Sequence, residues 1–115
     1  MNVKHLDEIP IHTVTMHGAE GVKVRRLISD LDGAEHFAMR LFELEPGGHT
    51  PLHTHDWEHE IYILDGTGIV HYEGQDYPMT SGTVLLVPGG KEHRFRNTGQ
   101  TPLRFLCIVP LRGDV

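Results

Sequence analysis

The sequence contains one cysteine and no long apolar segment, and each of these shortages excludes a class of protein. Cys107 has no second cysteine to bond with inside the chain, which excludes a disulfide framework and a zinc site made of several cysteines. Apolar runs such as residues 105–109 reach about a quarter of the roughly 20 residues that span a bilayer. We therefore expect no membrane partner, and we expect any metal to be held by side chains other than a set of cysteines.

Basic residues are also few. Lys and Arg number 10 against 16 Asp and Glu, which gives a net charge of −6. Apart from the neighbours Arg25 and Arg26 they are scattered, whereas binding to a phosphate backbone needs clustered positive charge. We predict no nucleic-acid partner. The first ten residues carry charges where a secretion signal requires an apolar stretch, which indicates a cytoplasmic protein.

The length and the turn residues predict one all-β domain. A chain of 115 residues is long enough for one domain over 1–115 and too short for a second with its own core. Its 13 glycines and 7 prolines separate short segments in which apolar and polar residues alternate. Residues 1–20 show no firm pattern and are expected to form an arm. The expected strands are residues 22–28, 37–45, 60–64, 69–72, 84–87, 93–96 and 103–109.

Alternation along two of these strands predicts which side chains face the interior. In the last strand, exposure of Arg104 to water turns Phe105 and Cys107 inward. In the second strand, the two later glutamates are natural solvent residues, which leaves Arg40 and Phe42 on the interior face. A buried arginine is costly unless it is paired. Its partner is either an anionic substrate or an acidic residue of the chain.

Histidine is the unusual component of the composition, with 10 copies. His53 and His55 lie two residues apart, so on a strand they share one face, and His59 follows three residues later. Downstream, the alternation of residues 93–96 turns His93 inward. We predict that these imidazoles converge on one point.

Two spacings accompany these histidines. The first is a glycine, five residues, His-x-His, three residues, a further histidine, six residues and a glycine, within Gly47 to Gly66. The second consists of Gly82, Pro88, Gly90, His93 and Asn97. Both resemble the two characteristic motifs of the cupin superfamily. The segment HTHDWEHE also resembles small single-domain members with a four-histidine metal site. We interpret the motif glycines as turn residues and Asn97 as the residue that closes a turn.

The first motif departs from the family pattern at one position. Where the family has a glutamate, this chain has His59, and the adjacent Glu60 satisfies the looser spacing that the family also uses. Counting back from Gly66 favours His59, which lies on the same face of the predicted strand as Ile61 and Ile63. Glu60 remains the alternative ligand.

The resemblance implies a cupin double-stranded β-helix, or jelly-roll, barrel over about residues 37–110. It also implies one divalent transition metal per chain, held by His53, His55, His59 and His93. Manganese or iron is favoured, with nickel, copper and zinc as alternatives. Four protein ligands on an octahedral ion leave two positions open for water, dioxygen or substrate.

We expect a pocket beside the metal. Its lining is predicted to include Phe42, Ile63, Phe105 and Cys107, with Arg40 orienting an anionic or phenolic substrate. The favoured function is a metal-dependent, dioxygenase-like oxidoreductase acting on a small molecule. The alternatives are a non-redox isomerase or decarboxylase and a non-enzymatic binding module. We also expect a homodimer, because residues 22–25 alternate like an edge strand that needs a partner.

Overall fold

The computed structural model describes residues 1–114, and within them the chain is mostly antiparallel sheet. The strands are β1 (His12–Thr13), β2 (Glu20–Ile28), β3 (Phe37–His49), β4 (His59–Asp65), β5 (Gly68–Tyr72), β6 (Gln75–Met79), β7 (Val84–Val87), β8 (His93–Asn97) and β9 (Leu103–Pro110). Three single-turn 3-10 helices accompany them, η1 (Leu6–Glu8), η2 (Asp30–Asp32) and η3 (Leu111–Gly113). The predicted all-β class is confirmed.

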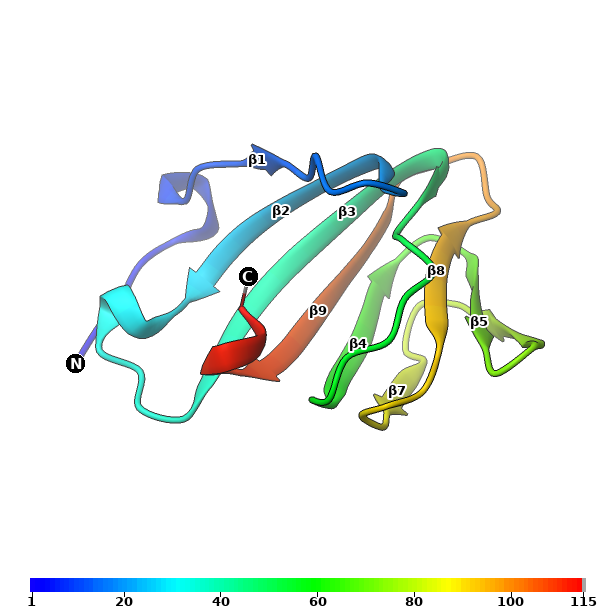
Figure 1. Ribbon diagram of the computed structural model, residues 1–115. Helices are drawn as coiled ribbons and strands as arrows, with labels where there is room; N and C mark the ends of the chain where they lie inside the picture. Colours follow the sequence, from blue (N-terminus) through cyan, green and yellow to red (C-terminus); the bar gives the residue numbers. More distant parts are fainter. Residues whose placement is uncertain (115) are drawn as a thin grey trace.

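Hydrogen bonding orders the strands β6-β5-β8-β3-β9-β4-β7, while β2 lies on β3 and β1 lies on β2. The long strand β3 connects the two walls of the fold. Its residues Phe37 to Leu44 pair with β9, and its last residue, His49, pairs with Arg96 of β8. Figure 1 shows β2, β3 and β9 side by side, with β5 and β8 in a separate wall. The sheet thus curls around an interior that both walls face.

The predicted strands are all present, with ends that differ by a few residues, and two further strands were not predicted. The strand β6 escaped prediction because most of its side chains are exposed and it contains Pro78. Proline is tolerated there because β6 is the last strand in the order and pairs only with β5. The turn between them uses left-handed backbone at Glu73 and Gly74, with φ of 48° and 81°.

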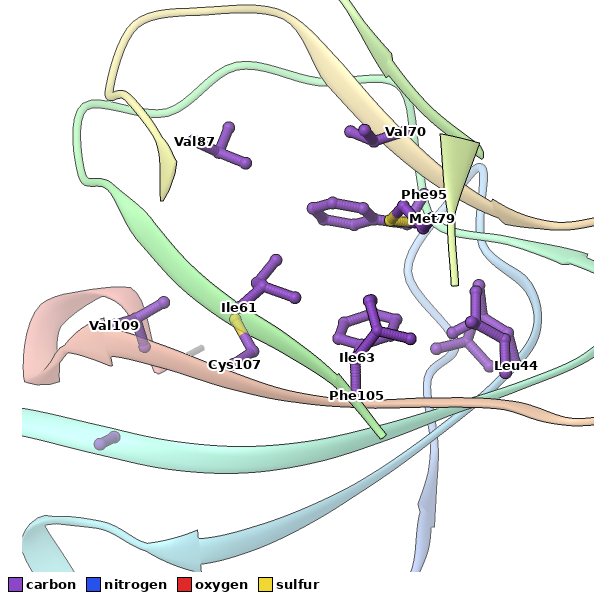
Figure 2. Close-up of a cluster of buried hydrophobic side chains, with 13 residues drawn as sticks. Leu44, Ile61, Ile63, Val70, Met79, Val87, Phe95, Phe105, Cys107 and Val109 are labelled. Carbon is purple, nitrogen blue, oxygen red and sulfur yellow. The ribbon is translucent and has the colours of Figure 1, made fainter. Parts of the chain in front are cut away.

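The core confirms the predicted strand faces. Alternate residues of β9 and β4 are buried, and Arg104 and Glu60 lie on the opposite faces. Figure 2 shows side chains from both walls meeting in one layer. The buried cluster consists of Val22, Ala38, Leu44, Ile61, Ile63, Val70, Met79, Val87, Phe95, Leu103, Phe105, Cys107 and Val109.

The motif residues serve turns, as predicted. Gly66 has φ of 92°, and a Cβ there would lie 2.6 Å from the carbonyl oxygen of Pro102, so no other residue fits without a shift. Asn97 donates from Nδ2 to the carbonyls of Leu44 and Thr101 at 2.9 and 2.8 Å. Its Oδ1 accepts from the backbone N–H of Gly99 at 2.8 Å.

Residues 1–20 are not a free arm throughout. Strand β1 pairs with β2 at His12 with Val24 and Thr13 with Lys23. The expected edge strand at residues 22–25 is therefore covered on both sides, by β1 and β3. These residues do not form a free sheet edge, so the surface on which a dimer was expected is not available. No helix within residues 1–114 is long and apolar enough to cross a membrane.

Candidate metal centre

Four histidines from the two motifs gather between the walls. His53 and His55 lie in the loop between β3 and β4. His59 is the first residue of β4, and His93 is the first residue of β8. His53 and His93 exchange two backbone hydrogen bonds, with N to O distances of 3.2 and 3.0 Å, which fix the loop against β8.

Their ring nitrogens are close enough to share an ion. Those of His53, His55 and His93 all lie within 4.8 Å of one another. Nε2 of His59 lies 2.7 Å from Nε2 of His55. The ring centroid of His59 lies 5.1 Å from that of His93. Three imidazoles thus form a set that can hold a metal ion, and His59 adjoins this set through His55.

Backbone carbonyls orient two of the rings. Nδ1 of His55 lies 2.8 Å from the carbonyl oxygen of Trp57, and Nδ1 of His93 lies 2.8 Å from that of Lys91. Because a carbonyl oxygen only accepts, both Nδ1 atoms carry the proton. The lone pair of each ring is then on Nε2, which metal binding requires.

His59 is oriented by a thiol instead. Its Nδ1 lies 3.0 Å from Sγ of Cys107. Without metal, the thiol donates to Nδ1 and the Nε2–H of His59 donates to Nε2 of His55, which accounts for the 2.7 Å separation. To bind a metal through Nε2, His59 takes the other tautomer and donates its Nδ1–H to Cys107. Burial raises the pKa of the Cys107 thiol, so it is protonated at neutral pH.

The cluster suits a metal in its charge state. Burial, together with the neighbouring imidazoles, lowers the pKa of His53 to about 4 and that of His59 to about 2. Burial also lowers the pKa values of His55 and His93. The rings are therefore neutral at pH 7, as metal ligands must be. Nε2 of His93 is buried without a hydrogen-bond partner in residues 1–114, and a metal ion would satisfy it.

The histidines open onto a cavity of about 320 Å³, near the lower end of the size range of small-molecule sites. His53, His55 and His59 line it, together with side chains from several strands. Residues 12–16 also line it, which the sequence did not reveal because that segment has no clear pattern. The segment before β2 thus contributes to the cavity wall.

Three of the predicted pocket residues line this cavity, namely Phe42, Phe105 and Cys107. Ile63 does not line it. It is 0% exposed in the core cluster, on the same face of β4 as His59 but four residues further along the strand. Its predicted inward direction was right, and its predicted place on the pocket wall was wrong, because the core fills this part of the barrel.

Arg40 faces inward, as predicted, and is 5% exposed. Its Nη2 donates to Sγ of Cys107 at 3.3 Å, and its guanidinium carbon lies 4.9 Å from the ring centroid of Phe42. Its Nε lies 3.9 Å from Oδ1 of Asp114 and makes no hydrogen bond within residues 1–114. Arg40 therefore has both an acidic neighbour and an unused donor. Asp114 carried no sequence signal.

Trp57 is a functional candidate that the sequence analysis did not single out. Its ring stacks on His55, with centroids 4.3 Å apart and planes 8° from parallel, and it also lines the cavity. The signal was its place inside HTHDWEHE. Trp57 fixes the plane of a cluster histidine through its ring and the Nδ1 proton of that histidine through its carbonyl.

Other polar residues near the motifs have ordinary roles. His71 pairs with Asp76 at 2.6 Å on the surface. His49 contacts the carbonyl of Thr50 and does not line the cavity. Glu60 is exposed on the outer face of β4, while His59 is 8% exposed on the inner face. The face predicted for His59 is confirmed.

Matches to known proteins agree with this architecture. The family model described as "Cupin domain" matches residues 40–109, which include all four cluster histidines. An oxalate-binding protein from Thermotoga maritima is 38% identical over 116 residues, covering 96% of this chain and 94% of that protein. A 1-methylthio-D-xylulose 5-phosphate methylsulfurylase from Rhodospirillum rubrum is 33% identical over 76 residues, covering 66% of this chain and 49% of that protein.

Solved structures match over nearly the whole chain. The polyketide cyclase RemF from Streptomyces resistomycificus is 34% identical with a TM-score of 0.91, covering 96% of this chain and 80% of that one. A predicted oxalate decarboxylase from Thermotoga maritima is 34% identical with a TM-score of 0.83, covering 96% of this chain and 99% of that one. The expected jelly-roll barrel is confirmed.

Proposed function

The chain belongs to the cupin family, and from this membership and the histidine cluster we propose that it is a metal-dependent enzyme acting on a small molecule. One observation carries the proposal. Neutral imidazoles meet at the wall of a cavity of about 320 Å³, and the buried Nε2 of His93 has no hydrogen-bond partner in residues 1–114. A divalent ion held there would supply a Lewis acid that polarises an oxygen atom of the substrate.

We propose one ion per chain, with His53, His55, His59 and His93 as its ligands. Imidazole suits several transition metals, so the ligand type alone does not choose among them. Manganese or iron is the proposed native metal. His59 is preferred to Glu60 because it lies on the inner face of β4, with its Nε2 beside that of His55.

The other cavity residues bind and enclose the substrate. Phe42, Phe105 and Phe95 line an aromatic wall that excludes water from the reacting group. Arg40 offers a buried guanidinium for a carboxylate or phenolate. The relative named as an oxalate-binding protein supports a small carboxylate as the substrate.

Two reaction classes are compatible with this site. The aromatic wall favours the oxygenase, since it shields a reactive intermediate from water. The non-redox alternative, an isomerase or decarboxylase, is favoured by the neighbouring structure that is a predicted oxalate decarboxylase. The names of the relatives reported above give no specific support to the oxygenase.

The deciding experiment compares turnover with and without oxygen. Protein loaded with Mn(II) or Fe(II) is assayed against oxalate, small keto acids, diketones and phenols, in air and under anaerobic conditions. Product formation with matching oxygen uptake supports the oxygenase, and turnover that persists without oxygen supports the non-redox class. Tight binding with no turnover of any bound compound would overturn the enzyme proposal in favour of a binding module.

Arg40 has its own variant in this assay. Arg40→Lys keeps the charge but loses the planar fork, so we expect weaker substrate binding with unchanged metal content. A loss of metal content in Arg40→Lys would contradict a role in substrate binding.

We also propose a homodimer, formed through another surface than the one first expected. The outer face beside the last strand in the order, β7, exposes Tyr62, Val84 and Leu86 at 47%, 70% and 61%. An apolar face next to an edge strand favours association unless it is covered. Light scattering at micromolar concentration tests the mass, and Val84→Lys should shift it toward 13 kDa.

A further inference from the structure

Two arginines lie opposite each other in the cavity wall. Arg26 of β2 and Arg40 of β3 are register partners, and both line the cavity. Like charges directly opposite each other on neighbouring strands repel. Arg40 is also buried, with an unused Nε donor within residues 1–114. An anion between the two guanidinium groups relieves this repulsion.

In this structure the anion is the chain's own carboxylate. Oδ1 of Asp114 accepts from Nε of Arg26 at 3.1 Å and lies 3.9 Å from Nε of Arg40. The Asp114 side chain is only 7% exposed. Asp114 directly follows η3, whose last residue, Gly113, lines the cavity together with Arg26 and Arg40.

The segment that carries Asp114 begins at Leu111, which packs against the core cluster and donates its backbone N–H to the carbonyl oxygen of His36 at 3.2 Å. Arg112 pairs with Asp56 at 2.8 Å, but both side chains are more than half exposed, and such pairs contribute little. Gly113 is buried against Trp57, and a Cβ there would lie 2.6 to 2.9 Å from atoms of the indole ring. Leu111 thus anchors the start of the segment, and the carboxylate of Asp114 is the side-chain contact that fixes its other end.

We propose that Arg26 and Arg40 form a carboxylate subsite and that Asp114 occupies it until the carboxylate of a small ligand takes its place. The proposal rests on the proposed function for the idea that the cavity receives a small molecule, and it names the chemical class as carboxylates with an apolar body. The apolar body fits the wall made by Phe42 and Phe105. Displacement of Asp114 also moves Gly113 away from Trp57.

Two chains of contacts link the subsite to the metal centre. Arg40 donates to Cys107, which contacts His59. Trp57 packs on Gly113 and stacks on His55. A carboxylate bound by the arginines thus places the rest of its molecule beside the histidines, and Asp114 is its competitor.

Metal-free protein tests the subsite independently of any enzymatic activity. Cyclohexanecarboxylate is the probe, its neutral amide is the control ligand, and binding is measured by calorimetry at constant ionic strength. Removing the internal competitor in Asp114→Asn should tighten binding by about tenfold, because the open site is no longer a minor population. Asp65→Asn, which loses an exposed pair with Arg104, is the matched control and should leave the affinity unchanged.

The single tryptophan gives a second readout in the unmodified protein. Because Trp57 packs on Gly113, the acid should shift its fluorescence emission to longer wavelength and the amide should not. Arg26→Gln should weaken binding of the acid by about tenfold, while the metal content of a separately loaded sample stays the same.

Unchanged or weaker binding in Asp114→Asn, with the fold intact by circular dichroism, would overturn the proposal and make Asp114 a structural anchor. Should that variant fail to fold, an emission spectrum of the unmodified protein that does not respond to saturating acid would overturn it equally. Carboxylate binding without catalytic turnover would contradict the enzyme proposal alone.

Discussion

The site around the cavity contains two functional parts that are built in different ways: the four cluster histidines, called here the histidine end, and Arg26, Arg40 and Asp114, called the arginine end. At the histidine end, backbone carbonyls hold His55 and His93, and reciprocal backbone hydrogen bonds tie His53 to His93. At the arginine end, Arg26 and Asp114 are held by side-chain contacts between segments 88 residues apart. The first end is fixed by the fold, and the second depends on an ion pair that another anion can replace.

This difference separates two tasks that the site must perform. A metal site needs ligands that are positioned before the ion arrives, and rings held through Nδ1 meet that need. A substrate site must exchange its occupant, which a carboxylate on a short segment permits. Variants at the histidine end should therefore change metal binding, and variants at the arginine end should change ligand binding without affecting the metal.

The largest expected effect is the loss of metal from variants of the histidine end. His55→Ala and His93→Ala each remove a ring that the backbone has already oriented, so we expect metal affinity to fall by more than about a hundredfold, beyond the effect of losing an outer partner. Elemental analysis of metal-loaded protein after dialysis measures this. His71→Ala, on the surface of β5, is the control and should keep full occupancy.

The same assay sharpens the ligand set. His59→Ala should lose metal, and Glu60→Ala should not, because Glu60 lies on the outer face of β4. Full occupancy in His59→Ala together with loss of metal in Glu60→Ala would show that the ligand assignment is wrong.

The next effect is the acid sensitivity of the metal-free protein. Unfolded histidines bind protons near pH 6.5, whereas burial lowers the pKa of folded His53 to about 4 and that of folded His59 to about 2. Below pH 6.5 the unfolded state therefore binds more protons, and stability falls as the pH falls. The urea midpoint of unfolding should decrease as the pH is lowered from 7.5 to 4.5. The midpoint of the His59→Gln variant should decrease less steeply.

The charge of Arg40 adds to the lowered pKa of His59, whereas Arg26 is not among its causes and stays charged throughout the range. Replacement of Arg26 should therefore leave this pH dependence unchanged. An Arg26→Gln variant whose urea midpoints follow a different slope from those of the unmodified protein would contradict the separation of the two ends.

Much of the fold was predictable because its signals are local. Alternation identified the strands with one buried face, including the inward side chains of β9 and β4. It missed β6, whose side chains are mostly exposed, and β1, which has two residues and both exposed. Those strands exist because neighbouring strands offer hydrogen-bond partners, and no property of their own side chains reveals this.

The site was predictable to the same extent. The histidines of the two motifs come together as expected, because motif spacing reflects strand faces and turns. The pairing of Arg40 with Asp114 was not predictable, because it depends on where η3 places the residue that follows it. The place of Ile63 was misjudged because alternation gives the side of a strand and not the depth along the barrel.

A smaller effect is expected from metal removal. An ion that binds only the folded state stabilises it by about 2.7 kcal/mol at a free concentration one hundred times its Kd. For a domain of this size that corresponds to about 10 °C in Tm. Calorimetry before and after chelation measures the shift. An unchanged Tm would contradict a site built into the fold. The Tm of the His93→Ala variant should be the same before and after chelation.

The smallest effect should come from Cys107, which contacts both the histidine end and the arginine end. Its Sγ contacts Nδ1 of His59 at 3.0 Å and accepts from Nη2 of Arg40 at 3.3 Å. Cys107→Val keeps the approximate size but removes the acceptor that a metal-bound His59 needs, so we expect about tenfold weaker metal binding, or about 1.4 kcal/mol. Cys107→Ser retains an acceptor and should bind metal more tightly than Cys107→Val. Competition with a chelator of known affinity measures both variants, and the Tm of each metal-free protein reports any packing defect separately. Equal weakening in the two variants would show that Cys107 serves the packing of the core and not the orientation of His59.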